Sequence, residues 1–163
     1  MKKVLLAVVL VVIAAQFIRP ERNTSNDITN DISKTFPVSD SVNVILKKAC
    51  KDCHSNHTEY PWYANIQPVA FWLARHIKEG KGHLNFSEFL NYPTWRQYHK
   101  LEEVEEVLAE DAEEKMPLFS YTLIHRDADL TDAERAQLVN WSIELRDLMK
   151  EQYPADSLVR PKK

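Results

Sequence analysis

The string Cys50-Lys51-Asp52-Cys53-His54 constrains the fold more than any other part of this chain. Two thiols three positions apart on a helical turn can each form a thioether bond to one of the two vinyl groups of haem. This C-x-x-C-H spacing is the attachment signature of c-type haem, and His54 can supply the proximal bond to the iron. A covalent tether retains the cofactor even in a small domain with little core. Cys50 and Cys53 are the only cysteines, so no disulfide forms elsewhere.

The composition predicts one all-α domain with a leader. The 163 residues include only two glycines, and no alternating β-branched run follows the N-terminus. Helices joined by loops that contain Pro, Asn and Asp fit this pattern. The formal charge of −3 argues against a nucleic-acid partner.

Residues 1–19 have the pattern of an export signal or membrane anchor. Two lysines precede an unbroken apolar stretch from Val4 to Ala15, and Phe17 and Ile18 extend it. This run is short for a bilayer span, which needs about 20 residues. We favour an uncleaved anchor over a cleaved signal peptide. Either one places the rest of the chain outside the cytoplasm, where exported proteins acquire covalent haem.

Three further regions follow the leader. Residues 20–38 are polar, rich in Asn, Ser and Thr, and predict a tether. Residues 39–153 carry the periodic apolar pattern of the haem-binding domain, and residues 154–163 are a polar tail. The chain shows no internal repeat.

Apolar spacing and capping signals predict the helices of the domain. The first has Val42, Ile45, Leu46 and Ala49 on one face, with Ser39, Asp40 or Ser41 as N-cap, and ends in the haem motif. The second begins near Pro68 and ends before Gly80, with a buried stripe of Val69, Trp72, Leu73, His76 and Ile77. A short piece starts at Asn85 or Ser87, and Thr94 caps a helix that Met116-Pro117 stops. The last begins with a capping box of Thr131 and Glu134 and presents Ala136, Val139 and Ile143, with Leu138, Trp141, Leu145 and Leu148 on a flanking row.

Two other chemistries use similar cysteine spacings. A redox dithiol needs a βαβ context, which this sequence lacks. A zinc site could combine Cys50 and Cys53 with His57 and one more histidine. The gap of twelve to fifteen residues that separates cysteines from histidines in a zinc finger is missing. We therefore favour haem and keep a zinc-stabilised interaction domain as an alternative.

The opposite face of the iron needs a ligand or an opening. Met116 is the first candidate, because the following proline stiffens the backbone and a thioether suits a soft iron orbital. The simpler interpretation is a core methionine at a helix end. His125 and His76 are the alternative distal ligands, although His76 also fits a core or surface-edge histidine.

Aromatic and acidic residues admit two interpretations each. Trp62, Tyr63 and Trp72 could wall a haem pocket, or they could simply be core. Eight acidic residues lie between Glu102 and Glu114. A solvated helix face is the simpler explanation, and a docking patch for a basic redox partner is the sharper one.

Several pieces together resemble the cytochrome-c-like haem-binding domain proteins of exported bacterial type. The matching pieces are Cys50 to Ser55, Tyr60 to Tyr63, Ile66, Pro68, Trp72, His76, Ile77, Gly80, Leu84 to Ser87, Met116, Pro117, Tyr121, His125, Leu130 and Trp141. The likeness spans most of residues 35–150. It implies a small, mostly helical cytochrome c domain with one haem, attached through Cys50 and Cys53, with His54 as proximal ligand and Met116 as distal ligand. The Met-Pro step is also similar to that of single-haem class I cytochromes c, from which the long insert of residues 57–100 departs.

The leading hypothesis is an exported, periplasmic protein that carries single electrons between redox partners through one covalent haem. The membrane is a further partner if the leader is retained. The first alternative is a haem-based small-ligand sensor or a peroxidase-like enzyme with an open distal face. Motifs for hydrolase or transferase chemistry are absent from the sequence, so an electron carrier is favoured over an enzyme.

Overall fold

The computed structural model describes residues 1–161, and this part of the chain is all-helical, as predicted. A single β-bridge joins Thr24 and His57, and no strand forms among the described residues. The α-helices are α1 (Lys2–Ala15), α2 (Asp40–Ala49), α3 (Lys51–His54), α4 (Val69–His83), α5 (Thr94–Leu108), α6 (Phe119–Thr122) and α7 (Asp132–Gln152). The 3-10 helices are η1 (Ile32–Lys34), η2 (Trp62–Asn65), η3 (Phe86–Asn91), η4 (Arg126–Ala128) and η5 (Ala155–Leu158).

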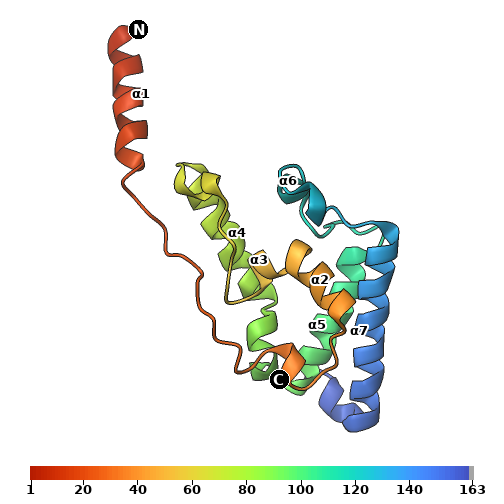
Figure 1. The fold of residues 1–163 in the computed structure, drawn as a ribbon. Helices are drawn as coiled ribbons and strands as arrows, with labels where there is room; N and C mark the ends of the chain where they lie inside the picture. The colour runs from red at the N-terminus through yellow and green to blue at the C-terminus, as the bar shows by residue number, and fades with distance from the viewer. Residues whose placement is uncertain (162–163) are drawn as a thin grey trace.

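Helices α5 and α7 lie side by side and form the main core with α2, while α4 lies across the molecule from them (Figure 1). Leu101 of α5 and Leu138, Leu145 and Met149 of α7 are almost completely buried in this core. The Ser142 hydroxyl is buried between the two helices and donates a hydrogen bond of 2.6 Å to the Leu101 carbonyl. Burial of each such apolar side chain contributes about 1.5–3 kcal/mol, so the α5–α7 contact is a large part of what stabilises the fold.

Local capping explains where two helices begin. The Ser39 hydroxyl accepts a hydrogen bond from the Val42 amide, and Thr131 and Glu134 form the predicted capping box. The prediction that Thr94 caps α5 is wrong, because Pro93 takes the cap position and no side chain bonds there.

Two predicted helical features also differ from the structure. Helix α5 ends at Leu108, well before Met116, and turns follow it. In α7 the predicted flanking row with Leu138, Trp141 and Leu145 faces the core, whereas Ile143 is 40% exposed. Both rows have helical spacing, so the positions of α5 and the other elements packed on α7 decide which one is buried.

Residues 20–36, called here the N-terminal segment, lie in the predicted tether but contact the domain. Ile32 and Phe36 are buried in the main core, and Asp31 caps η1 by accepting from the Ser33 amide. Asn23 binds the loop after α3: its side-chain amide donates to the Ser55 carbonyl and the Thr58 hydroxyl. Ile32 and Phe36 lie four positions apart and share one helical turn. No sequence pattern indicated this turn, because the residues around it are mostly polar.

The two ends of the chain differ. None of the side chains of α1 is buried, and the helix extends away from the body (Figure 1). At its C-terminal end, the side chain of Gln16 accepts a hydrogen bond of 3.0 Å from the Gln67 amide and donates one of 3.3 Å to the Gln67 carbonyl. Among the described residues, no helix has the length and apolar character that crossing a membrane requires. In the predicted polar tail, Leu158 of η5 is buried in the main core, and residues 162–163 lie outside the described residues.

Candidate functional site

The C-x-x-C-H string forms a single helical turn. Helix α2 ends at Ala49, and the backbone of Cys50 departs from helical geometry with φ −127° and ψ −46°. Helix α3 then runs for four residues, with the His54 amide bonded to the Cys50 carbonyl at 2.9 Å. The break after α2 turns the motif away from that helix and presents both cysteines and His54 from one turn.

The two thiols contact different walls of the molecule. Cys50 packs against the main core, whereas Cys53 packs against a small cluster of Ala64, Leu73 and Ile77 from η2 and α4. Both cysteines are free. Burial raises the pKa of Cys50 to about 12 and that of Cys53 to about 11, so both are neutral thiols at neutral pH. As free thiols they are available for thioether bonds.

The imidazole of His54 is oriented by the end of α4. Its Nδ1 lies 3.0 Å from the carbonyl oxygen of Leu84. A carbonyl can only accept, so Nδ1 carries the proton and the lone pair of Nε2 is free to bind a metal. Burial lowers the pKa of His54, which favours the neutral ring that ligation requires. The chemistry of this turn, two neutral thiols followed by an oriented imidazole, fits haem.

Gly80 brings α4 against the helical turn of residues 50–54, called here the attachment turn after its predicted role. A Cβ atom at this position would lie 2.8 Å from the Cys53 carbonyl oxygen and 3.1 Å from the Cys53 Cβ. Only glycine allows this approach without a shift of backbone. The prediction that α4 ends before Gly80 is therefore wrong: the helix continues to His83, and the next residue supplies the Leu84 carbonyl to His54.

A family model described as haem-binding domain matches residues 10–144. The chain belongs to the haem-binding domain family. The matched span contains the attachment turn, α4, α5 and more than half of α7. No curated protein and no solved structure matches the chain.

In this haem-binding domain the three predicted pocket aromatics have different surroundings. Tyr63 packs with Cys53 around the small cluster of η2 and α4. Trp62 is 76% exposed. Trp72 is 42% exposed, and its ring lies tilted by 40° against that of His76, with centroids 4.1 Å apart. The structure thus brings Tyr63 to the attachment turn, and contact of Trp62 and Trp72 with haem stays a prediction.

The distal candidates lie on separate elements. Met116 is half-buried, and its backbone is bound to both long helices, by its amide to the Val107 carbonyl and by its carbonyl to Arg135. His76 Nδ1 bonds to the carbonyl of its own helix at Trp72. His125 Nε2 bonds to the Tyr63 hydroxyl at 2.5 Å. Each candidate keeps one possible ligating atom without a hydrogen-bond partner among the described residues: the Met116 sulfur, His76 Nε2 and His125 Nδ1. Ligation by Met116 stays a prediction.

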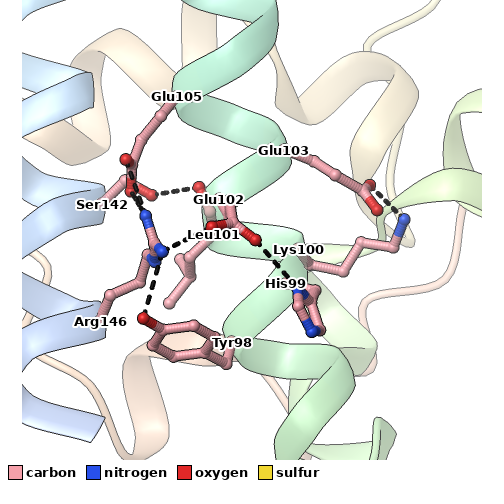
Figure 2. Close-up of polar contacts among 9 residues, drawn as sticks. All are labelled: Tyr98, His99, Lys100, Leu101, Glu102, Glu103, Glu105, Ser142 and Arg146. Carbon is pink, nitrogen blue, oxygen red and sulfur yellow. Dashed lines mark hydrogen bonds and ion pairs between the residues drawn. The ribbon is translucent and has the colours of Figure 1, made fainter. Parts of the chain in front are cut away.

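The acidic part of α5 is partly neutralised within the haem-binding domain, as Figure 2 shows. Arg146 of α7 binds Glu105 at 2.9 Å and Glu102 at 2.7 Å. Glu103 pairs with Lys100 on α5 itself. The helix face toward α7 is therefore an interhelical contact, and a docking role for the remaining carboxylates stays a prediction.

Two residues at the attachment turn, Asp52 and Tyr121, were assigned no role from the sequence. The Tyr121 hydroxyl donates a hydrogen bond of 2.8 Å to the carboxylate of Asp52, inside the motif. The middle positions of C-x-x-C-H are unrestricted, so Asp52 gave no sequence signal.

The zinc alternative gains no support, because no group of three or more His, Cys, Asp or Glu side chains among residues 1–161 could hold a metal ion.

Proposed function

We propose that this haem-binding domain holds one covalent c-type haem and transfers single electrons outside the cytoplasm. The hydrogen bond between His54 Nδ1 and the Leu84 carbonyl carries the proposal. It leaves Nε2 as the free nitrogen of an imidazole that follows two unpaired thiols on one turn. Such an arrangement suits axial ligation beside two thioether bonds.

Each residue of the site has a proposed role. Cys50 and Cys53 hold haem through thioethers, His54 is the proximal ligand and Met116 is the distal ligand. The bound haem supplies one-electron chemistry between ferric and ferrous iron. The protein contributes orientation through Leu84 and partial burial of the attachment turn. We propose the cytochrome-c-like fold on the same grounds.

The location and partners follow from the termini and charges. Helix α1 begins with Lys2 and Lys3 and continues with an apolar run, which supports export and, if the helix is retained, attachment to a membrane. The proposed partners are redox proteins, and the carboxylates of α5 beyond the Arg146 contacts favour a basic one.

A pyridine haemochrome spectrum after denaturation tests covalent attachment. Protein exported from cells with haem-attachment machinery is compared with the Cys50→Ala and Cys53→Ala variants. We expect a c-type spectrum that survives denaturation in the wild type. In each variant the haem keeps one unreacted vinyl group, and we expect its spectrum to shift toward that of haem with free vinyl groups. Extraction of all haem from denatured wild type would disprove the proposal.

Substitution of Met116 tests the distal ligand. Met116→Ala should lower the reduction potential and let the reduced protein bind carbon monoxide, because a thioether ligand raises the potential and occupies the sixth position. Met149→Leu is a control at a buried core methionine that takes no part in the site. An unchanged potential and spectrum in Met116→Ala removes this residue from the ligand set. Rapid carbon monoxide binding in the wild type favours the sensor or peroxidase-like alternative.

A further inference from the structure

Four side chains form a series of contacts near Cys53. Tyr63 packs on the same small cluster as Cys53, and its hydroxyl bonds to His125 Nε2 at 2.5 Å. The His125 ring stacks on Tyr121 with centroids 4.3 Å apart and an interplanar angle of 14°. The Tyr121 hydroxyl donates to Asp52, the residue before Cys53. We call Asp52, Tyr63, Tyr121 and His125 the tyrosine latch.

The latch joins distant parts of the chain to the attachment turn. Tyr121 and His125 belong to residues 118–128, which contain α6 and η4 and lie above α3 in Figure 1. This segment has little apolar anchorage: Phe119 is 78% exposed and Ile124 is 59% exposed. In residues 118–128, η4 packs on α2, whereas α6 is connected to α3 by the hydrogen bond from Tyr121 to Asp52.

Asp52 is a fixed anchor for this contact. Its carboxylate also accepts from the Glu59 amide at 2.9 Å, and its carbonyl accepts from the Thr58 hydroxyl. Burial raises the pKa of both latch tyrosines, with Asp52 and Cys53 adding to the effect. The phenols therefore keep their protons, and Tyr121 can donate a charge-assisted hydrogen bond.

We propose that the tyrosine latch holds residues 118–128 over the Cys53 side of the haem site and restricts access of external ligands to it. The proposal rests on covalent haem at Cys53, the proposed function above. Tyr63, Tyr121 and His125 act as positioning residues in this role. The latch also keeps Nε2 of His125 engaged with Tyr63, away from other partners.

The test uses full-length, haem-loaded protein with Tyr121→Phe and Tyr63→Phe. Both variants delete one hydroxyl and keep the ring. Tyr153→Phe is the matched control, because Tyr153 packs on the main core and its hydroxyl has no hydrogen bond among the described residues. Amide hydrogen exchange of residues 118–128 is measured in each variant. The rate of carbon monoxide binding to the reduced protein is measured in the same variants with Met116→Ala added, because Met116 would otherwise occupy the sixth position of the iron. Far-ultraviolet circular dichroism checks that each variant is folded.

We expect each latch variant to exchange amides 118–128 about tenfold faster, as loss of one such hydrogen bond allows, and to bind carbon monoxide faster. Tyr153→Phe should change neither rate. Unchanged exchange in both latch variants overturns the proposal. Faster exchange with unchanged carbon monoxide binding also overturns it, since the latch is then only structural. The haemochrome spectrum of the wild-type sample tests the proposed function separately. If the wild type shows no c-type spectrum, the proposed function is wrong. If it carries covalent haem but the latch variants have unaltered rates, the latch proposal alone is wrong.

Discussion

The two glycines of α4 differ in what surrounds them. A Cβ at Gly80 would meet the Cys53 carbonyl oxygen at 2.8 Å, whereas a Cβ at Gly82 would meet nothing within 4 Å. Glycine inside a helix costs stability relative to alanine, because it loses more conformational freedom on folding. At Gly80 that cost is offset by the close contact of α4 with the attachment turn.

The glycines therefore give opposite predictions. Gly80→Ala should destabilise the protein by about 1–3 kcal/mol, because the added methyl must displace backbone. It should also reduce haem content. The control Gly82→Ala should stabilise the fold by about 0.5–1 kcal/mol through helix propensity. Urea unfolding and haem-to-protein ratios measure both effects. Equal stability changes in the two variants contradict the assigned role of Gly80.

At the scale of elements, Arg146 joins α7 to α5. Its guanidinium donates to both oxygens of Glu105, at 3.0 and 2.9 Å, to Glu102 at 2.7 Å and to the Tyr98 hydroxyl at 3.1 Å (Figure 2). The side chain is only 16% exposed. Several hydrogen bonds to one partly buried guanidinium hold the Arg146 side chain more firmly than a single exposed ion pair would. Removal of Arg146 leaves the carboxylates of Glu102 and Glu105 close together without a cation between them.

Replacement of this cation should weaken the α5–α7 contact. Arg146→Leu should lower the free energy of unfolding by about 1–2 kcal/mol, since Glu102 and Glu105 lose their partner and repel each other. Lys150→Met removes an exposed cation of the same helix, paired with Asp147 at 53% and 60% side-chain exposure, and serves as control. Chemical denaturation of both variants provides the comparison. A loss no greater in Arg146→Leu than in the control contradicts this account.

At the scale of the whole molecule, the N-terminal segment binds across the attachment loop. The Asn23 amide group donates to Ser55 and Thr58, and its side-chain oxygen accepts from Lys81 of α4. The backbone of Asn23 also bonds to Thr58 and the Tyr60 hydroxyl. Asn23 thus connects the N-terminal segment to the loop after α3 and to α4.

Truncation of this side chain should loosen the segment. Asn23→Ala should cost about 1–3 kcal/mol, because buried partners lose their hydrogen bonds. Amide exchange should rise in residues 22–30 and 55–60. Asn26→Ala is the control, since Asn26 is exposed and its side chain bonds to none of the described residues. Exchange that rises equally in both variants rejects the assigned role.

Acid should destabilise the whole fold through two carboxylates. The hydrogen bond from His99, with Arg146 nearby, lowers the pKa of Glu102, and the hydrogen bond from Lys48 lowers that of Glu134. A folded-state pKa below the unfolded value means that the unfolded chain binds more protons in acid. The contribution is complete above the ordinary Glu pKa of about 4.3 and is lost as pH falls through the folded-state values.

Glu134→Gln should therefore flatten the acid side of the stability profile. Unfolding by urea between neutral pH and about pH 3 measures the slope, which reports the difference in bound protons between the two states. Glu144→Gln is the control, because Glu144 is exposed and forms no ion pair among the described residues. An unchanged slope in Glu134→Gln shows that Lys48–Glu134 does not contribute.

The sequence by itself determined the features that depend on near neighbours. The attachment turn, the Ser39 and Thr131 caps and the all-helical class follow from spacing within one or two turns. These features need only local backbone geometry and the residue types that satisfy it.

Only the tertiary structure decided what depends on elements far apart in the chain. The need for glycine at position 80 comes from α3 crossing α4, and the buried row of α7 comes from the positions of α5 and the other elements packed on α7. The latch between Asp52 and Tyr121 joins residues 69 positions apart, and the burial of Ile32 and Phe36 joins a polar segment to the core. Such contacts leave no periodic signal in the sequence, because the spacing of apolar and capping residues around one partner does not depend on where the other partner lies.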